Sequence, residues 1–205
     1  MNDIFTPLNI TLPLTLQGSV VRLEPVHREH AVLFWEAAKD DLDDIFRWIP
    51  YAMKSREDFE KLVDKAFAEQ ERGESVVFAT VERASGKTVG STRFMNIDRV
   101  NKRVEIGSTW VARAWQRTAV NTEAKYLMLR HAFEAWGCIR VELKTDGLNQ
   151  RSRNAILRIG AKEEGTLRRQ LVTSTGRVRD TVYFSILDSE WPEVKSRLES
   201  KLASQ

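Results

Sequence analysis

Residues 115–125 read WQRTAVNTEAK and stand where strand-like sequence gives way to helical sequence. Before them, residues 103–113 (RVEIGSTWVAR) have the composition of a strand. After them, residues 119–136 carry apolar side chains over a wide arc, which is typical of a helix packed between a sheet and further protein. We expect this helix to begin near Asn121 or Thr122. Its first backbone N–H groups then lack partners and carry partial positive charge, so this end suits an anion such as phosphate.

The side chains of this stretch permit two interpretations. Four of them add hydrogen-bond donors around the helix end, which favours an anion site: Arg113, Gln116, Arg117 and Thr118. The alternative is purely structural, with Asn121 or Thr122 capping the helix and Glu123 complementing its dipole. Local chemistry leaves both interpretations open.

The rest of the chain predicts one α+β domain, mixed and three-layered. Residues 19–24 predict a first strand, and two helices follow, the second opened by a capping box of Ser55 and Asp58. The spacing of apolar residues then changes to the alternation typical of strands, and a hairpin is expected to turn at Gly86. A β-α-β unit, a short helix and closing strands follow. We expect a domain spanning 1–205, with its core at about 19–188, an N-terminal extension at 1–18 and a C-terminal helix at 189–202.

The composition predicts a soluble cytoplasmic protein. Charged residues make up 30% and hydrophobic residues 42% of the 205 residues, a typical globular profile. No apolar run approaches the roughly 18–20 residues that span a bilayer, and the acidic start of the chain does not resemble a signal peptide. The single cysteine, Cys138, fits a reducing compartment and is expected to be an inert, buried hydrophobe. A net charge of +3 is too small to indicate nucleic-acid binding by itself.

Several familiar sites are excluded. Residues 85–88 (SGKT) resemble the end of a P-loop, but the first required glycine falls on Val81 and a strand follows instead of a helix. The sequence contains neither G-x-S-x-G nor G-x-G-x-x-G, which argues against a hydrolase elbow and a dinucleotide fold. No metal is expected, because the histidines show no metal-ligand spacing with the cysteine: His27, His30 and His131.

The order of elements, together with specific residues, resembles the GNAT superfamily of acetyl-CoA-dependent N-acetyltransferases. The shared features are a strand containing Gly107, a Q-x-x-small-x loop, a helix that starts with TEA, and a second strand followed by N-x-x-S. The resemblance covers about residues 19–188 and is greatest to the RimJ/RimL branch of ribosomal-protein N-terminal acetyltransferases. Its segments are VRLEPV, ASGKTVG, VEIGSTWV, NTEAK, KTDGLNQRS and IGAKEEGTLRR. It implies a central, mostly antiparallel twisted sheet, splayed near its middle and flanked by helices.

The resemblance also implies an acetyl-CoA site. The family's pyrophosphate loop, (Q/R)-x-x-G-x-(G/A), falls on residues 116–121. Gln116 matches the first position, but Ala119 and Asn121 replace the two small residues that the family usually has at the fourth and sixth positions. The preceding strand end would offer backbone groups to the pantetheine arm, and a backbone N–H there would polarise the acetyl carbonyl. The implied cofactor-binding residues are Trp110, Val111, Ala112, Gln116, Arg117, Thr118, Ala119, Val120, Asn121, Thr122, Asn149, Arg151 and Arg153.

Asn149 and Ser152 match the family's N-x-x-S. The resemblance gives Asn149 a hydrogen bond to the pantetheine and Ser152 a contact with the leaving thiolate. Arg151 and Arg153 would then suit the remote phosphate. Each has an ordinary explanation, as helix cap, first-turn serine or solvated arginine.

Glu105 is the candidate general base, because only a neutral amine can attack a thioester and several family members place a carboxylate here. Strand alternation puts Glu105 on one face and Val104 and Ile106 on the other. A surface salt bridge to Arg103 or Arg140 is the competing explanation.

Two segments, residues 43–55 and 168–180, flank the acceptor groove in this fold. Phe46, Trp48 and Tyr51 are therefore candidate substrate-binding residues, with burial in the core as the default alternative.

The function expected is acetyl transfer from acetyl-CoA to a primary amine, either a protein N-terminus or a small molecule. A non-catalytic acyl-CoA-binding or interaction module is the alternative. RNA binding ranks last and would use Arg151, Arg153, Arg158, Arg168 and Arg169. The protein is expected to be a monomer, or a homodimer formed through an exposed final strand, residues 182–187 (VYFSIL).

Overall fold

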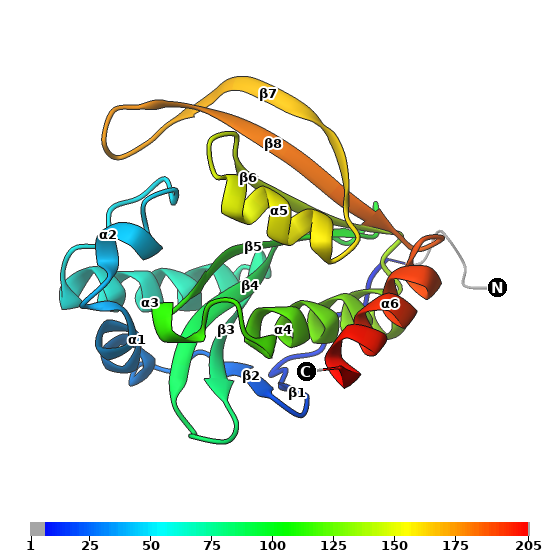
Figure 1. Cartoon of the computed structure of the whole chain (residues 1–205), viewed down its shortest axis with the longest axis horizontal. Coiled ribbons are helices and arrows are strands. Elements are labelled where there is room, and N and C mark those ends of the chain that lie inside the picture. Colours follow the sequence, from blue (N-terminus) through cyan, green and yellow to red (C-terminus); the bar gives the residue numbers. More distant parts are fainter. Residues whose placement is uncertain (1–6, 205) are drawn as a thin grey trace.

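An eight-stranded sheet organises residues 7–204, the part of the chain that the computed structural model describes (Figure 1). The strands are β1 (Leu16–Gln17), β2 (Val21–Pro25), β3 (Ser75–Glu82), β4 (Thr88–Asp98), β5 (Arg103–Val111), β6 (Arg140–Asp146), β7 (Lys162–Val172) and β8 (Val178–Leu187). Their order across the sheet is β1-β2-β3-β4-β5-β6-β8-β7, and every neighbouring pair is antiparallel except β5 and β6. The predicted α+β class and mostly antiparallel sheet are confirmed.

Helices cover both faces of this sheet. They are α1 (His30–Ala38), α2 (Leu42–Ile45), α3 (Arg56–Glu71), α4 (Ala119–Arg130), α5 (Gln150–Arg158) and α6 (Trp191–Ala203), with a 3₁₀ turn η1 (Arg113–Trp115) and a π-helical turn η2 (His131–Ala135). The predicted capping box of Ser55 and Asp58 opens α3, and Gly86 turns the β3–β4 hairpin with a φ of +67°. In residues 7–204 none of the helices is both long and apolar enough to span a membrane.

The sheet separates two apolar cores. The larger one packs α4 and α6 against strand residues such as Phe94 and Ile106, and the smaller one packs α1 and α3 around Trp110. β3 serves both cores, because its alternate residues Val76 and Val77 point to opposite faces. All eight residues of β3 are buried, as expected for a strand covered on both sides.

The sheet opens between β5 and β6. These strands pair in parallel only over Arg103–Glu105 and Arg140–Glu142, and further along they are no longer paired. β5 also carries a bulge near Gly107, where Ser108 has a φ of +45°. A Cβ at position 107 would lie 2.9 Å from the Sδ of Met95, so a larger residue does not fit there without a shift. The predicted splay and the predicted irregularity at Gly107 are both confirmed.

The helix after the opening begins earlier than we expected. Thr118 is its N-cap and Ala119 its first residue, so the predicted start near Asn121 or Thr122 is wrong. The Thr118 hydroxyl donates to the Trp115 carbonyl at 2.7 Å and accepts from the Val120 N–H at 3.3 Å. The chain turns into the helix at Arg117, whose φ is +64°. The hydroxyl cap and this left-handed turn explain the earlier start.

Glu123 does more than complement the dipole of α4. Its buried carboxylate accepts hydrogen bonds from the backbone N–H groups of Ser19, Val20 and Val21 and from the Ser19 hydroxyl, all between 2.7 and 2.9 Å. A Cβ at Gly18 would lie 2.3 Å from the Glu123 Cδ, so the turn can approach only as glycine. The side chain therefore joins the β1–β2 turn to α4.

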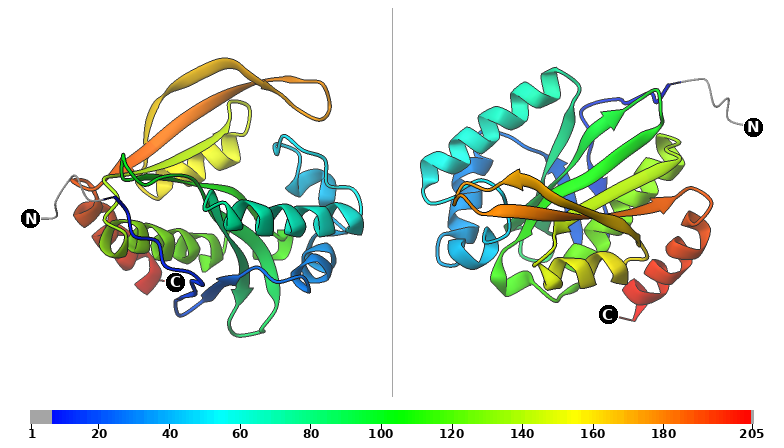
Figure 2. Two further views of the ribbon diagram at one scale, coloured as in Figure 1. Left: turned by 180° about the vertical axis from the view of Figure 1, so that it is seen from behind. Right: turned by 90° about the horizontal axis from the view of Figure 1, so that it is seen from above.

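The edges of the sheet also differ from expectation. The last strand, β8, lies between β6 and β7, so the expectation that the final strand is an exposed edge is wrong, and the choice between monomer and homodimer stays a prediction. β7 forms the edge instead, because the chain passes from α5 to the outside of the sheet before β8 fills the gap. Seen from above, the β7–β8 arm runs across the molecule from α6 toward α1 and α2 (Figure 2). The single-domain organisation remains a prediction, and residues 1–6 of the N-terminal extension lie outside the described residues.

Replacing Glu123 by glutamine should lower the free energy of unfolding by about 2–4 kcal/mol, because the amide NH₂ would face backbone donors and leave them unpaired. Urea unfolding measures this loss. Glu60→Gln is the matched control on α3, where the carboxylate makes an exposed ion pair with Arg56, and its effect should stay within about 0.5 kcal/mol. Equal losses in the two variants would refute the role of Glu123.

Candidate functional site

The N-terminus of α4 faces the opening between β5 and β6. No side chain in residues 7–204 accepts a hydrogen bond from the N–H groups of Ala119 or Asn121, so these amides remain available to an anion. Both residues are helical, and the left-handed position of the loop is Arg117. The backbone conformation therefore does not require glycine at 119 or 121.

Gln116 joins three elements around this helix end. Its Nε2 donates to the Val111 carbonyl at 3.0 Å, and its Oε1 accepts from Arg151 on α5 at 2.7 Å. The predicted residues Val111, Gln116 and Arg151 thus come together, although they are far apart in the sequence. Arg151 also forms an ion pair with Asp44 at 3.2 Å, so a carboxylate already neutralises part of the positive charge of its guanidinium.

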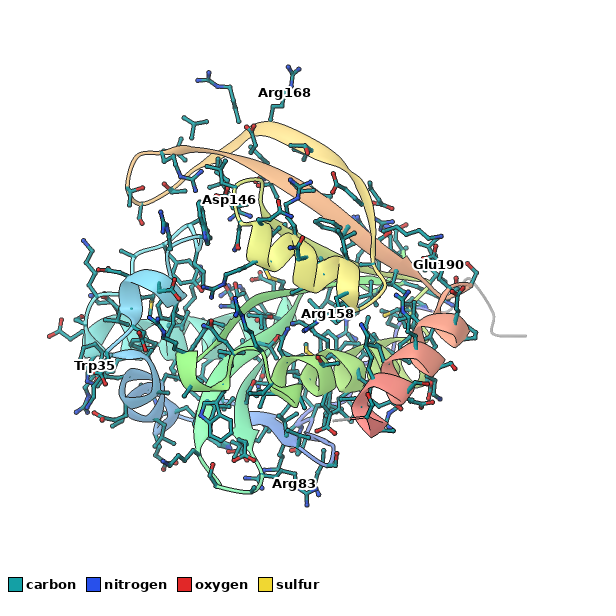
Figure 3. The ribbon with its side chains drawn as sticks, in the orientation of Figure 1. Trp35, Arg83, Asp146, Arg158, Arg168 and Glu190 are labelled. Atoms are coloured by element: carbon teal, nitrogen blue, oxygen red, sulfur yellow. The ribbon has the colours of Figure 1, made fainter. Side chains whose placement is uncertain are left out.

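Arg158, which the sequence places only among the residues for RNA binding, is a further candidate for the anion site. Its guanidinium lies 3.5 Å from the Thr122 hydroxyl and sits between α5 and α4 (Figure 3). Arg153 lies elsewhere, because its guanidinium pairs with Glu163 on β7 at 3.0 Å. A signal for Arg158 was its spacing from Arg151, seven residues or about two helical turns, which places both on one face of α5.

The donors at this helix end fit the diphosphate of coenzyme A. Free amides, the positive end of the helix dipole and nearby arginines are the groups that bind phosphate. The Oδ1 atom of Asn121 is buried without a partner among the described residues, and rotation of that amide would place a donor at the same point. No group of three or more histidine, cysteine or acidic side chains among the described residues is arranged to hold a metal ion.

Asn149 and Ser152 open α5 beside the same opening. Asn149 is the N-cap, and its side-chain oxygen accepts from the Ser152 N–H at 3.1 Å. This is the structural interpretation of Asn149, and it leaves the Nδ2 for other partners. Ser152 is half-buried, and its catalytic role remains a prediction.

Glu105 is held rigidly on the face opposite Val104 and Ile106, as alternation predicted. Only 2% of it is exposed, and its carboxylate bonds to the Asn96 amide at 2.7 Å and to the Lys144 ammonium at 2.9 Å. The competing ion pairs of Glu105 with Arg103 or Arg140 do not form. Arg103 pairs with Asp98 and Glu142, and Arg140 with Glu142 and Glu164.

The two predicted acceptor segments meet. The Ser174 N–H donates to the Pro50 carbonyl at 2.8 Å, and the Arg177 guanidinium stacks 5.5 Å from the Trp48 ring. Between the segments lies a cavity of about 130 Å³, lined by both, to which Phe46 and Tyr51 contribute. Phe46 also packs against Trp110 at 5.4 Å, so it serves the core as well.

Asp146 anchors the arm that closes this groove, and sequence reasoning missed it. Its buried carboxylate, at the end of β6, bonds to Arg177 of the β7–β8 connection and lies 3.8 Å from Arg179 of β8. Figure 3 shows Asp146 below the arm and Arg168 on the outer side of β7, pointing away. The signal in the sequence was an acidic residue at the end of a strand, directly before the loop that carries Asn149.

Trp110, at the end of β5, contributes to the site differently from Val111. Its ring is buried against Phe34, Phe46 and Phe59 in the smaller core, and its Nε1 has no hydrogen-bond partner in the part of the chain that the structure describes. Only the backbone of Trp110 can therefore contribute to a pantetheine contact.

Cys138 is buried, and burial raises the pKa of its thiol to about 12, in line with an inert role.

Lys125 is the other residue that sequence reasoning missed. It lies on the buried face of α4, where its Nζ donates to the Thr109 hydroxyl at 2.5 Å and the Thr92 hydroxyl at 3.1 Å. Burial alone lowers the pKa of this amine to about 7. A charged residue directly after Ala124, within an apolar arc, was the signal that could have revealed it.

Comparison with known proteins identifies the family. A family model described as "Acetyltransferase (GNAT) domain" matches residues 21–162. The crystal structure of a GCN5-related N-acetyltransferase from Brucella melitensis has a TM-score of 0.86 at 33% identity, covering 95% of this chain and 88% of that one. The Mycobacterium smegmatis RimJ structure, in complex with CoA-disulfide, has a TM-score of 0.78 at 25% identity, covering 92% and 93%.

The chain belongs to the GNAT acetyltransferases, which confirms the resemblance drawn from its sequence. Its relatives support the RimJ/RimL-like branch. Among them is a Bacillus subtilis (strain 168) protein named as a ribosomal N-acetyltransferase, YdaF, which is 35% identical over 106 residues. That match covers 52% of this chain and spans 57% of the length of YdaF.

Stability should depend on pH through Lys125. Between pH 10.5 and about 7 the unfolded chain binds a proton that the folded chain does not, so stability falls as the pH is lowered and the loss is complete below pH 7. From pH 7 to pH 9 the free energy of unfolding of the wild type should therefore rise by about 2 kcal/mol more than that of Lys125→Met. Urea titrations at both pH values measure this difference, and parallel pH curves for the two proteins would contradict it.

Proposed function

We propose that this acetyltransferase moves the acetyl group of acetyl-CoA to a primary amine, on a protein N-terminus or a small molecule, by direct attack in a ternary complex. The observation that carries the proposal is the free N-terminus of α4, which faces the opening between β5 and β6. Acetyl-CoA supplies the thioester. Residues of the chain would bind the two substrates, orient the acetyl group and accept the proton of the amine.

The backbone amides of residues 119–122 would bind the diphosphate, with Arg158 beside them. The backbone at the end of β5, at Trp110, Val111 and Ala112, would bind the pantetheine arm, because β6 no longer pairs with β5 there. A backbone N–H beside it, at the bulge of β5, would polarise the acetyl carbonyl and stabilise the negative charge that develops on it.

The acceptor would enter between residues 43–55 and 168–180. Only a neutral amine attacks, and an α-amino group with a pKa of about 8 needs little help to lose its proton. Glu105 would accept that proton directly or through water, with Lys144 and Asn96 fixing its orientation. Ser152 would donate a hydrogen bond to the departing thiolate at the start of α5.

A non-catalytic acyl-CoA-binding module is the competing proposal. Its main support was the replacement of the small loop residues by Ala119 and Asn121, and both adopt ordinary helical geometry. RNA binding has less support, because Arg151 and Arg153 are paired with Asp44 and Glu163.

Release of free thiol from acetyl-CoA, measured with small amines and with peptides of varied first residue, tests the proposal. At least one amine should give release well above the rate without acceptor. Ser152→Ala should lower kcat by roughly 10- to 100-fold and leave the Kd for coenzyme A within about twofold, because the hydroxyl acts on the leaving group. Ser189→Ala, at an exposed serine before α6, is the control and should behave as wild type.

A protein that binds coenzyme A but releases no thiol with any acceptor would favour the binding module. Unchanged turnover in Ser152→Ala would remove the role of Ser152 and leave the transferase intact.

A further inference from the structure

Beneath the opening of the sheet lies a polar cluster that the proposed chemistry does not use. It consists of Lys125 on α4, Thr92 on β4 and Thr109 on β5. The two hydroxyl oxygens lie 2.8 Å apart, and the Lys125 Nζ donates to both. One amine therefore links a helix to two neighbouring strands inside the larger core.

The cluster sits on the bulge of β5. Arg93 pairs with Gly107 and Ser91 with Trp110, so Thr92 alone faces the two residues Ser108 and Thr109. Such a bulge leaves one residue of the longer strand without a partner in the ladder. Lys125 thus bonds to the residue opposite the bulge and to a residue within it.

The bulge needs support, because its backbone is strained. Ser108 has a φ of +45°, a region that residues other than glycine, asparagine and aspartate seldom adopt. The Thr109 hydroxyl is also 3.5 Å from the Gly107 carbonyl, so the lysine contact reaches across the bulge through one side chain. A fixed hydroxyl at Thr109 therefore favours one conformation of residues 107–109.

This arrangement costs stability. Within residues 7–204 no carboxylate bonds to Lys125, and an amine buried without a counter-charge is unfavourable. Two hydroxyl acceptors satisfy two N–H groups, and an apolar side chain of similar length would fill the same space at lower cost. A residue that costs stability where the sheet opens is typical of a functional requirement rather than of packing.

We propose that Lys125 is a positioning residue for acetyl transfer, whose bonds to Thr92 and Thr109 hold the β5 bulge in the conformation that meets the acetyl carbonyl. The inference rests on the proposed function. It assigns to this lysine no contact with either substrate and no transfer of a proton. Its effect reaches the reaction only through the backbone of residues 107–109.

The bulge and the diphosphate site are separate, so loss of the contact should affect turnover and not cofactor affinity. In Lys125→Met, kcat should fall by about 10-fold or more, because small displacements at the reacting centre are costly, and the Kd for coenzyme A should stay within about twofold. Thr109→Val should lower kcat in the same way, whereas Thr109→Ser keeps the hydroxyl and should retain most of the activity. The double variant Lys125→Met/Thr109→Val should lose little beyond either single change, because both remove the same contact.

Leu127→Met is the control for a changed side chain in the same helix and core, and its kcat should match that of wild type. Amide hydrogen exchange provides a readout that does not need activity. Exchange at residues 107–110 should speed up in Lys125→Met and Thr109→Val but not in Thr109→Ser or Leu127→Met. Should Lys125→Met fail to fold, the Thr109 pair tests the same contact.

Wild-type kcat together with unchanged exchange in Lys125→Met or Thr109→Val would overturn the inference while leaving the transferase proposal intact. A fall in kcat matched by an equal fall in cofactor affinity would also overturn it, because general distortion would then be the cause. A wild-type protein without acetyl transfer would instead refute the proposed function, and with it the positioning role. Exchange at the bulge would then show only whether Lys125 supports its backbone.

Discussion

The buried carboxylate of Glu123 is the contact on which the site depends most. Its four hydrogen bonds fix the β1–β2 turn against the second turn of α4, and this sets where the helix ends relative to the sheet. The free amides of Ala119 and Asn121 lie about one turn away on the same helix. A shift of that helix by one residue would move its end by about 1.5 Å, enough to misplace amides that must meet a diphosphate.

The opening of the sheet supplies the second half of the site. Parallel pairing between β5 and β6 ends after three residue pairs, and the bulge near Gly107 bends β5 away. Within residues 7–204, the strand edge that results has no neighbouring strand to pair with its backbone, which is the condition for binding an extended pantetheine chain. Residues on three separate elements then converge on this opening: Val111 at the end of β5, the amides of α4 and Arg158 on α5.

Much of this could be predicted from sequence, because it depends on local rules. Periodicity located α3, the β3–β4 hairpin and the strand containing Gly107, and the N-x-x-S motif located the start of α5. The beginning of α4 was misplaced by two to three residues, since the left-handed turn at Arg117 depends on a conformation that arginine seldom adopts.

The contacts that the sequence did not reveal are those between residues far apart along the chain. Glu123 meets Ser19 across 104 positions, Asp146 meets Arg177 across 31, and Lys125 meets Thr92 across 33. The order of β7 and β8 in the sheet is also a long-range property, since either strand could have paired with β6. No local pattern encodes such contacts, so only the fold brings them together.

The central claim is that the backbone amides opening α4 bind the diphosphate of coenzyme A. It is tested most directly by following ¹H–¹⁵N signals of the protein as coenzyme A is added, with pantetheine, which lacks the diphosphate, as the comparison. The account predicts that the amide signals of residues 119–122 shift most with coenzyme A and stay nearly unmoved with pantetheine. Signals at residues 119–122 that do not respond to saturating coenzyme A would contradict it.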